Sequence, residues 1–335
     1  RMTLATAGRA ALFALAAAIP VTACVAQPAA QGQRVFPVAE APVLDDRFPV
    51  QGVPFPDGVT AYRDVAYQQL PGHIPQIVDI YVPKEPGPHP LVLYIHGGGW
   101  QGGHTRHSGA LANFPEVLAK LASEGFVVAS LEYRLSGEAR YPAQLLDAKA
   151  SLRFLAKNAA QYRIDPSRIG VWGGSAGGHL TALTVLTCRD TAIDPASAAD
   201  PCASAAVTWY GVFDFPAMAA GREGGIDTAV ERLLGCEGRC PADRYAVASP
   251  STYIDAKDPA FLLIHGEEDK VVPVAQSRLG EAQLKRAGVP VESIYIPAVD
   301  HSFIGRTLQE TREATLRAAN ATFDFFHARL KGHGR

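Results

Sequence analysis

The sequence has no run of Lys or Arg and no acidic tail, and its 31 basic and 33 acidic side chains nearly cancel. Proteins that bind nucleic acids usually carry a basic patch or stripe, so this class of partner is disfavoured. Charged residues make up only 19% of the chain and hydrophobic residues 47%, as in ordinary globular proteins. A chain of 335 residues can bury a large core. This balance favours a globular protein that acts on a small, nearly neutral substrate.

The apolar run near the start of the chain is too short to cross a bilayer. Ala10–Val21 has about twelve residues, whereas a membrane-spanning helix needs about 20. Arg1 and Arg9 precede this run, and small residues follow it up to Cys24. Basic residues, a short apolar run and small residues in this order are typical of a secretory signal, and less so of a buried N-terminal helix. Residues 1–24 are therefore predicted to be a signal peptide.

The end of this segment, Val21-Thr22-Ala23-Cys24, resembles a bacterial lipobox. The resemblance implies cleavage before Cys24, diacylation of that residue, and anchoring by lipid chains that bury CH₂ groups at about 0.8 kcal/mol each. Val25, in place of Asp, points to the outer membrane of a Gram-negative cell. The alternative is a plain cleaved signal and a secreted protein. We expect an exported protein, either a periplasmic or outer-membrane lipoprotein or a secreted one, with residues 25–58 as a tether rich in Pro, Ala and Gln.

Cysteine is scarce after Cys24, and the four remaining residues are Cys188, Cys202, Cys236 and Cys240. No Cys-x-x-Cys pair and no His cluster accompany them, which disfavours a zinc site. An even number of cysteines in an exported chain is typical of disulfides, and four cysteines allow three pairings. The local pairing, Cys188 with Cys202 and Cys236 with Cys240, is favoured because these residues lie in loop-like segments rich in Asp, Pro, Gly and Ala.

From about residue 60, short apolar runs alternate with helical periods, which predicts one α/β domain over residues 59–335. The expected architecture is an eight-stranded, mostly parallel sheet with helices on both faces. The predicted strands are Asp64–Gln69, Ile77–Val82, Leu91–Ile95, Val127–Leu131, Ile169–Trp172, Ala206–Trp209, Phe261–Ile264 and Ser293–Ile296. Helical patterns lie at about 108–123, 145–155 and 316–330. Residues 215–252 break the rhythm and predict a small cap inserted above the sheet.

The strongest pattern for chemistry is Gly173-x-Ser175-x-Gly177, directly after an apolar strand and directly before a helical run. In this context the pattern is typical of a nucleophile elbow and not of an ordinary tight turn. Side chains at Gly173 and Gly177 would collide with the neighbouring strand and helix. The helix N-terminus would also favour developing negative charge beside Ser175. We predict that Ser175 is the nucleophile of a serine hydrolase.

A second glycine-rich segment, residues 96–100, ends an earlier predicted strand. Acyl transfer needs backbone N–H groups aimed at the carbonyl oxygen as it becomes an oxyanion, and glycines leave such amides free. The pattern predicts oxyanion donors at Gly98 and Gly99, with the amide of Ala176 as a third. Trp100 is predicted to line the substrate pocket.

An acidic partner is expected in the polar turn after the predicted strand 261–264. Asp269 precedes an apolar Val-Val-Pro turn that would desolvate it, and its role would be to hold the base in the correct tautomer. Glu267 and Glu268 are rival candidates, which we interpret as solvated turn residues. His265 ends the strand and is interpreted as structural.

The base is predicted to be His301, in the loop after the last strand. The order Ser175, Asp269, His301 is the chain order of this class of hydrolase. His301 would take the proton from Ser175 and return it to the leaving alcohol. His96 precedes the nucleophile and is interpreted as ordering the glycine loop, and Asp300 is interpreted as solvent-facing.

At these residues the chain resembles bacterial α/β-hydrolases of the esterase and lipase type, related to the hormone-sensitive-lipase group. It resembles most closely the acetylxylan and feruloyl esterase-like branch. The similarity runs from about Tyr62 to the C-terminus, and its motifs are residues 96–100, 132–135, 165–168, 173–178, 265–269 and 300–301. The resemblance implies the α/β-hydrolase fold, carboxylic ester hydrolysis without metal or organic cofactor, and support of the oxyanion loop by residues 132–134. It does not identify the acyl or alcohol group.

The leading hypothesis is a serine carboxylesterase that cleaves short-chain or carbohydrate-linked acyl esters through an acyl-enzyme. An exported peptidase or amidase of the prolyl-oligopeptidase type is the second hypothesis, disfavoured because about 60 residues before the first strand are too few for a propeller domain. Arylformamidases share the pattern of residues 96–100, but the export signal argues against that activity. A non-catalytic binding lipoprotein is the third hypothesis, and the complete set Ser175, Asp269 and His301 argues against it.

Overall fold

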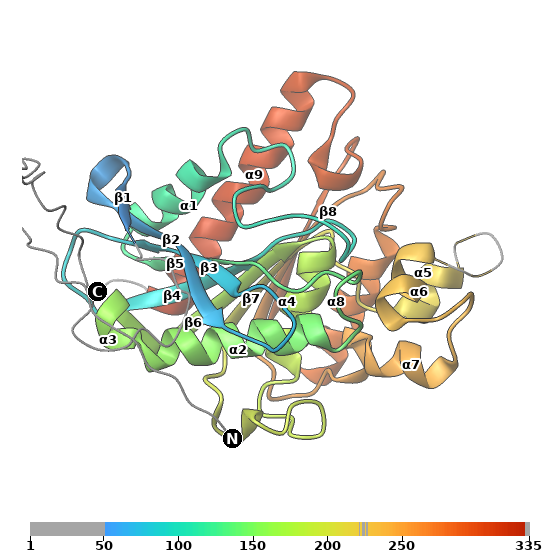
Figure 1. Cartoon of the computed structure of the whole chain (residues 1–335). Helices are drawn as coiled ribbons and strands as arrows, with labels where there is room; N and C mark the ends of the chain where they lie inside the picture. The colour runs from blue at the N-terminus through green and yellow to red at the C-terminus, as the bar shows by residue number, and fades with distance from the viewer. Residues whose placement is uncertain (1–50, 221, 223–224, 226, 332–335) are drawn as a thin grey trace, which may run out of the picture. The chain divides into compact units, whose positions relative to one another are not determined.

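The computed structural model describes residues 51–220, 222, 225 and 227–331, and these residues are built around a nine-stranded sheet (Figure 1). The predicted signal peptide, Cys24 and most of the predicted tether lie outside the described residues. The strand order is β1-β2-β3-β5-β4-β6-β7-β8-β9. The pairs β1–β2, β2–β3 and β3–β5 are antiparallel, and all the others are parallel. The bounds are β1 (Gly52–Pro54), β2 (Thr60–Gln68), β3 (Gln76–Val82), β4 (His89–Ile95), β5 (Val127–Leu131), β6 (Ile164–Gly174), β7 (Ala205–Trp209), β8 (Ala260–Gly266) and β9 (Val291–Ile296).

The mostly parallel sheet confirms the predicted α/β-hydrolase fold, and each of the eight predicted strands overlaps a strand of the structure. The ninth strand, β1, pairs with β2 and lies inside residues 25–58, which the sequence analysis assigned to a tether. A strand of three residues is too short for an alternating pattern to emerge from the sequence. The sheet therefore begins before residue 59.

Helices cover both faces of the sheet. The helices α1 (Phe114–Ser123) and α9 (Leu308–Phe326) pack on one face, and α2 (Ala143–Lys157), α4 (Ala176–Leu186) and α8 (Ala275–Ala287) pack on the other. In β4, Val92 and Tyr94 are buried in the apolar core under α1 and α9, whereas Leu91 and Leu93 are buried in the core under α2, α4 and α8. Successive side chains of a strand point to opposite faces, so a strand buried on both sides is a continuous apolar run. A further short helix, α3 (Ala159–Tyr162), follows α2.

Two helices differ from their predicted extent. The helix predicted at 108–123 begins only at Phe114, because the side chain of Asn113 caps it by accepting a hydrogen bond from the first turn. The helix predicted at 316–330 begins earlier, at Leu308, as α9. The apolar residues of the predicted pattern face the core at Ala319, Phe326 and Leu330, whereas Leu316 is 47% exposed. The predicted core face of this helical pattern is thus confirmed apart from its first residue. No helix within the described ranges is long and apolar enough to span a membrane.

Within its described residues, the predicted insertion at 215–252 forms the short helices α5 (Phe215–Ala220), α6 (Thr228–Leu234) and α7 (Ala242–Val247) and a 3-10 turn at Pro250–Thr252. Figure 1 shows them grouped at one end of the sheet. Phe215, Leu233 and Tyr245 are buried in the same apolar core as α2 and α4. The insertion is therefore packed into the domain and shares its core.

The structure joins Cys188 to Cys202 and Cys236 to Cys240, as the local pairing predicts. The two bridges differ in loop length, with 14 residues of separation in the first and 4 in the second. Cross-linking restricts the unfolded chain more when the closed loop is longer. The Cys188–Cys202 bridge is therefore expected to stabilise the fold more than the other.

Replacing Cys188 and Cys202 together with Ser is expected to lower the free energy of unfolding by about 3 kcal/mol. The Cys236→Ser, Cys240→Ser double variant is the matched comparison and should lose about 1 kcal/mol less, because its loop is shorter. Urea denaturation of the three oxidised proteins measures both differences. Equal losses would show that loop closure does not account for the stabilisation.

Candidate active site

Ser175 stands at the sharp turn between β6 and α4, with φ 56° and ψ −121°. A non-glycine residue rarely adopts this conformation, so the surroundings must hold it. The N–H of Ser175 donates to the carbonyl of Trp209 on β7 (2.9 Å). A Cβ atom on Gly177 would overlap the carbonyl oxygen of Ile95, and one on Gly173 would come within 2.7 Å of the same oxygen. The two glycines thus let α4 approach β4 closely enough to hold the strained turn.

The structure brings Ser175, His301 and Asp269 together in a hydrogen-bonded chain. His301 Nε2 lies 3.0 Å from Ser175 Oγ, and His301 Nδ1 lies 2.8 Å from Asp269 Oδ2. An ionised carboxylate only accepts, so Nδ1 carries the hydrogen and Nε2 is free to accept from the serine hydroxyl. This is the tautomer that a general base needs in order to activate Ser175.

Asp269 is buried and saturated with donors. Its Oδ1 accepts from the amides of Val271 (2.9 Å) and Val272 (2.8 Å), while Oδ2 faces His301 and His265. Burial opposes ionisation, but the hydrogen bonds from His265 and His301 outweigh it and lower the pKa of Asp269 to about 2. The acid is therefore ionised throughout the pH range in which His301 can act as a base.

The rival acids of the same turn lie elsewhere. Glu267 pairs with Arg278 (2.9 Å) and Glu268 with Arg306 (3.0 Å), and all four side chains are exposed. Both glutamates are thus the surface residues that the sequence analysis took them to be.

The lowered pKa of Asp269 predicts how stability depends on pH. The ordinary value is near 4, so ionised Asp269 stabilises the fold above about pH 4, and this contribution disappears as the pH falls through about 2. At neutral pH the free energy of unfolding of the Asp269→Asn variant should be about 2–3 kcal/mol lower than that of the unaltered protein. This difference should shrink below about pH 4. Urea denaturation across this range measures it, with Glu267→Gln as an exposed control. A difference that does not change with pH would contradict the assignment.

Asp300 was predicted to be solvent-facing, but the structure gives its carboxylate three specific partners. Its Oδ1 accepts from the backbone amides of Lys270 (2.9 Å) and His301 (2.7 Å), and its carboxylate pairs with the Lys270 ammonium (3.2 Å). These hydrogen bonds lower the pKa of Asp300. The residue ties the turn that bears the acid to the loop that bears the base, a link between segments that no local pattern reveals.

The loop after β4 lies over the nucleophile. A Cβ atom on Gly97 would come within 3.3 Å of the Ser175 Cβ. Gly98 and Gly99 have φ values of +115° and +60°, a region that favours glycine. The backbone amides of Gly98, Gly99 and Ala176 donate no hydrogen bond within the described part of the chain. These three amides are therefore available as the predicted donors to an oxyanion.

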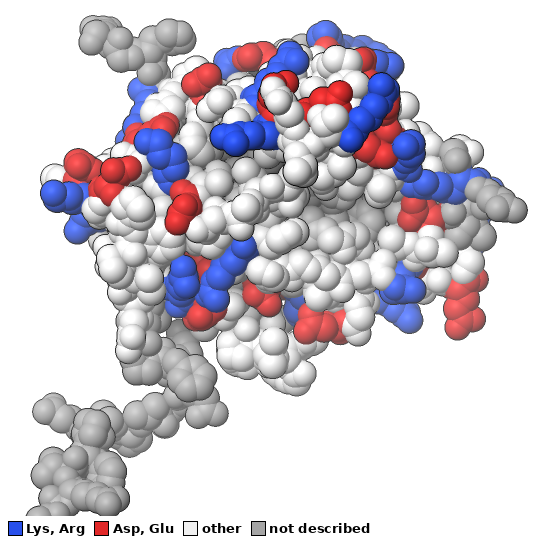
Figure 2. Space-filling view, turned by 90° about the horizontal axis from the view of Figure 1, so that it is seen from above, with Lys and Arg blue, Asp and Glu red and all other residues white. Residues whose placement is uncertain are grey.

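A cavity of about 500 Å³ opens above Ser175. Its walls come from the glycine loop, the segment that follows it, and the loops after β6, β7, β8 and β9, and they include Gly98, Gly99, His107, Tyr210 and His301. The lining is small and mostly uncharged. Figure 2 shows, on the face of the molecule seen from above, a hollow among uncharged side chains with Lys, Arg, Asp and Glu mainly nearer the border. The lining residues that the structure describes include no Lys, Arg, Asp or Glu.

Residues 78–284 match the model of the BD-FAE family. The chain belongs to this family. The resemblance drawn from the motifs is therefore confirmed, since the match covers more than half of the chain.

Curated relatives of this BD-FAE member include esterases. It is 33% identical over 220 residues to the probable carboxylic ester hydrolase LipM of Mycobacterium tuberculosis, a match that covers 65% of this chain and 50% of the relative. It is 30% identical over 238 residues to the esterase LipQ of the same organism, covering 70% of this chain and 55% of LipQ. The chain spans about half the length of these curated relatives.

Solved structures with the same fold include carbohydrate esterases. A truncated carbohydrate esterase from gut microbiota superposes with a TM-score of 0.68 at 28% identity, covering 84% of this chain and 100% of that one. The acetyl ester-xyloside bifunctional hydrolase of Caldicellulosiruptor lactoaceticus gives a TM-score of 0.65 at 27% identity, covering 80% and 93%. Family, fold and chemical class therefore agree with the triad geometry.

Trp100 does not line the substrate cavity of this BD-FAE domain, which corrects the prediction. It is 3% exposed and has φ +58°, and its indole packs edge-on against Phe215 of α5. The indole N–H donates to His179 Nδ1 (3.2 Å), and His179 Nε2–H donates to the carbonyl of Ala248 (2.7 Å). Burial lowers the pKa of His179 to about 4, which keeps the ring neutral in this chain. Trp100 thus anchors the oxyanion loop to α4 and to the insertion.

His96 supports the oxyanion loop, as predicted for a structural residue. It is buried, and its ring stacks on Tyr133 at 4.3 Å between centroids. The Tyr133 hydroxyl donates to the backbone carbonyl of His96 (3.0 Å). Burial lowers the pKa of His96 to about 4. Arg134 was also predicted to support this loop. Its guanidinium pairs with the buried Asp147 of α2 (2.7 Å).

The insertion flanks the cavity above Ser175 without lining it, as far as the structure describes its residues. Arg232 of α6 donates to the side chain of Gln101, in the glycine-rich loop after β4. Arg222 donates to the carbonyl of Val271, in the turn after β8 that carries Asp269. The predicted cap therefore braces two loops of the site from the side.

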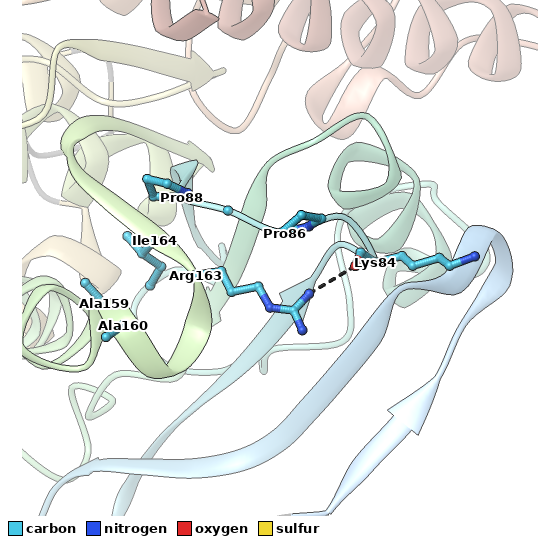
Figure 3. Close-up of a pocket in the computed structure, with 8 residues that line it drawn as sticks. Lys84, Pro86, Pro88, Ala159, Ala160, Arg163 and Ile164 are labelled. Carbon is cyan, nitrogen blue, oxygen red and sulfur yellow. Dashed lines mark hydrogen bonds between the residues drawn. The ribbon is translucent and has the colours of Figure 1, made fainter.

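A larger cavity, of about 610 Å³, lies away from the triad at the amino ends of β4 and β6 (Figure 3). The Arg163 guanidinium there donates to the backbone carbonyls of Pro83 (3.1 Å) and Lys84 (3.1 Å). Its donors hold the loop before β4, so Arg163 has a structural role beside this cavity.

Proposed function

We propose that the protein hydrolyses carboxylic esters through an acyl-enzyme, and that its substrates carry short or carbohydrate-linked acyl groups. The observation that carries the proposal is the chain Ser175–His301–Asp269 beneath three free backbone amides. Membership of the BD-FAE family and the likeness to carbohydrate esterases support the substrate class.

The geometry orders the reaction. Ser175 Oγ attacks the ester carbonyl while its proton passes to His301 Nε2, and the amides of Gly98, Gly99 and Ala176 stabilise the oxyanion. His301 returns the proton to the leaving alcohol, and the acyl group stays on Ser175. Water then attacks the acyl-enzyme with His301 again as base and releases the acid. The buried charge of Asp269 stabilises the imidazolium in both steps.

An ester panel tests the proposal. The purified protein should hydrolyse acetyl and other short-chain nitrophenyl esters faster than long-chain ones, and should deacylate acetylated xylan or a feruloyl ester. A proline amide is included because an exported peptidase is the competing hypothesis. Turnover of the amide alone would overturn the esterase proposal in favour of the peptidase. Activity confined to long-chain esters would overturn the substrate class.

The proposal extends to location. The basic, apolar and small residues before Cys24 support export with lipid attachment at that residue, and the two disulfides support an oxidising compartment. Metabolic labelling with a fatty-acid probe should mark the unaltered protein in the membrane fraction. The Cys24→Ala variant should not be labelled. Label in both proteins, or in neither, would refute acylation at Cys24.

A further inference from the structure

His265 lies behind the triad, at the carboxyl end of β8, and is fully buried. Its Nε2 lies 2.8 Å from the carbonyl oxygen of Val272 and 3.2 Å from Asp269 Oδ2. Its Nδ1 lies 2.7 Å from the hydroxyl of Ser277 on α8, also fully buried. His265 takes no part in the proton transfers between Ser175 and His301.

The partners of His265 determine where its hydrogen lies. A backbone carbonyl only accepts, so Nε2 carries a hydrogen, which it donates to Val272 while it also lies 3.2 Å from Asp269 Oδ2. The hydroxyl of Ser277 then donates to Nδ1. His265 is therefore held with an N–H edge toward the triad acid, and two imidazole nitrogens face the same oxygen, Asp269 Oδ2, at 3.2 Å and 2.8 Å.

We propose that His265 is a positioning residue which, with Ser277 behind it, orients Asp269 Oδ2 toward His301 and limits how strongly that oxygen holds the imidazolium. This inference rests on the proposed function of the triad. A donor beside a carboxylate stabilises its charge and so reduces how strongly that carboxylate attracts a second donor. Without His265, Asp269 would hold the protonated base more tightly, and His301 would release its proton only at higher pH.

Other groups around the base are accounted for. Asp300 accepts from the His301 amide and pairs with Lys270, and the ring of Tyr210 lies 4.7 Å from the ring of His301. His107 lines the same cavity, and Arg222 is directed at backbone carbonyls and at Asp227. Within the described residues only the two imidazoles approach Asp269 Oδ2, so a change at His265 alters one donor to that oxygen.

The test uses a readout that does not need ester turnover. The second-order rate of phosphonylation of Ser175 by a fluorophosphonate is measured by intact mass as a function of pH, since this reaction also requires His301 as base. For His265→Leu we expect the acid limb of the profile to move to higher pH by about 0.5–1 unit. His265→Gln, whose amide can donate to Asp269 and accept from Ser277, should restore the limb to within about 0.2 unit of the unaltered protein.

Ser277→Ala keeps His265 but removes the hydroxyl that donates to its Nδ1. The acid limb of the phosphonylation profile of this variant should also move to higher pH, by a smaller amount than in His265→Leu. Ser151→Ala is the matched control, because Ser151 is equally buried but donates within α2, and its limb should not move. Lower reactivity at an unchanged limb in both His265→Leu and Ser277→Ala would overturn the proposal and leave His265 as a brace for the turn.

If His265→Leu does not fold, the Ser277→Ala and His265→Gln profiles decide. Failure of the protein to hydrolyse any ester while the limb still shifts would refute the proposed function and not this inference.

Discussion

Ser175→Ala is expected to reduce ester turnover by about 10⁴–10⁶-fold. The variant removes the only atom that can form the acyl-enzyme, while the free amides and the cavity remain. Residual activity should come from the oxyanion donors and substrate binding alone. The backbone of the turn is held by contacts from β4 and β7, so the variant should fold. Steady-state kinetics with a short-chain ester measure the loss.

Two controls sharpen this result. Covalent labelling by a fluorophosphonate should disappear in Ser175→Ala and persist in Glu267→Gln, whose side chain lies in an exposed ion pair. Ser175→Gly should be equally inactive but more stable than Ser175→Ala by about 1 kcal/mol, since glycine relieves the strain of φ 56°. Full activity in Ser175→Ala would refute the nucleophile, and a less stable glycine variant would refute the strain.

Gly98→Ala is expected to lower kcat by about 10²–10³-fold with a much smaller change in KM. The residue has φ +115°, and a Cβ atom there would overlap the carbonyl oxygen of Gly102. The loop must shift to admit the methyl group, which moves the amides of Gly98 and Gly99 away from the position of the oxyanion. These donors act on charge that develops only in the transition state, so the loss should fall on kcat.

Gly137→Ala provides the matched control for Gly98→Ala. A Cβ atom on Gly137 meets nothing within 4 Å, and this residue lies outside the cavity above Ser175. It should keep its activity. An increase in KM with unchanged kcat in Gly98→Ala would mean that the loop binds the ester ground state and does not stabilise the oxyanion.

Local sequence patterns predicted most of the fold and of the candidate site. Strands buried on both faces are continuous apolar runs, so eight of nine strands could be located. The nucleophile elbow needs glycines within two residues of Ser175, and the oxyanion loop needs them beside a strand end, so both were recognisable. The orders of Ser175, Asp269 and His301 along the chain then limited the choice of acid and base.

Several features depended on contacts between distant segments. The indole of Trp100 turns into the core because two residues more than 70 positions away receive it. His179 offers an acceptor for the indole N–H, and Phe215 offers an apolar wall. Asp300 joins a turn 30 residues earlier in the chain. A residue type in isolation carries no information about such partners.

The amino-acid sequence was thus sufficient for the nucleophile, its base, its acid and the glycine loop, because each depends on backbone constraints within a few residues. Only the tertiary structure decided that Ser175 Oγ lies 3.0 Å from His301, that Asp269 is shared by two imidazoles, and that the insertion braces the site from the side. The physical reason is that these distances result from how β4, β6, β8 and the loops after them pack together, and packing is a property of the whole domain.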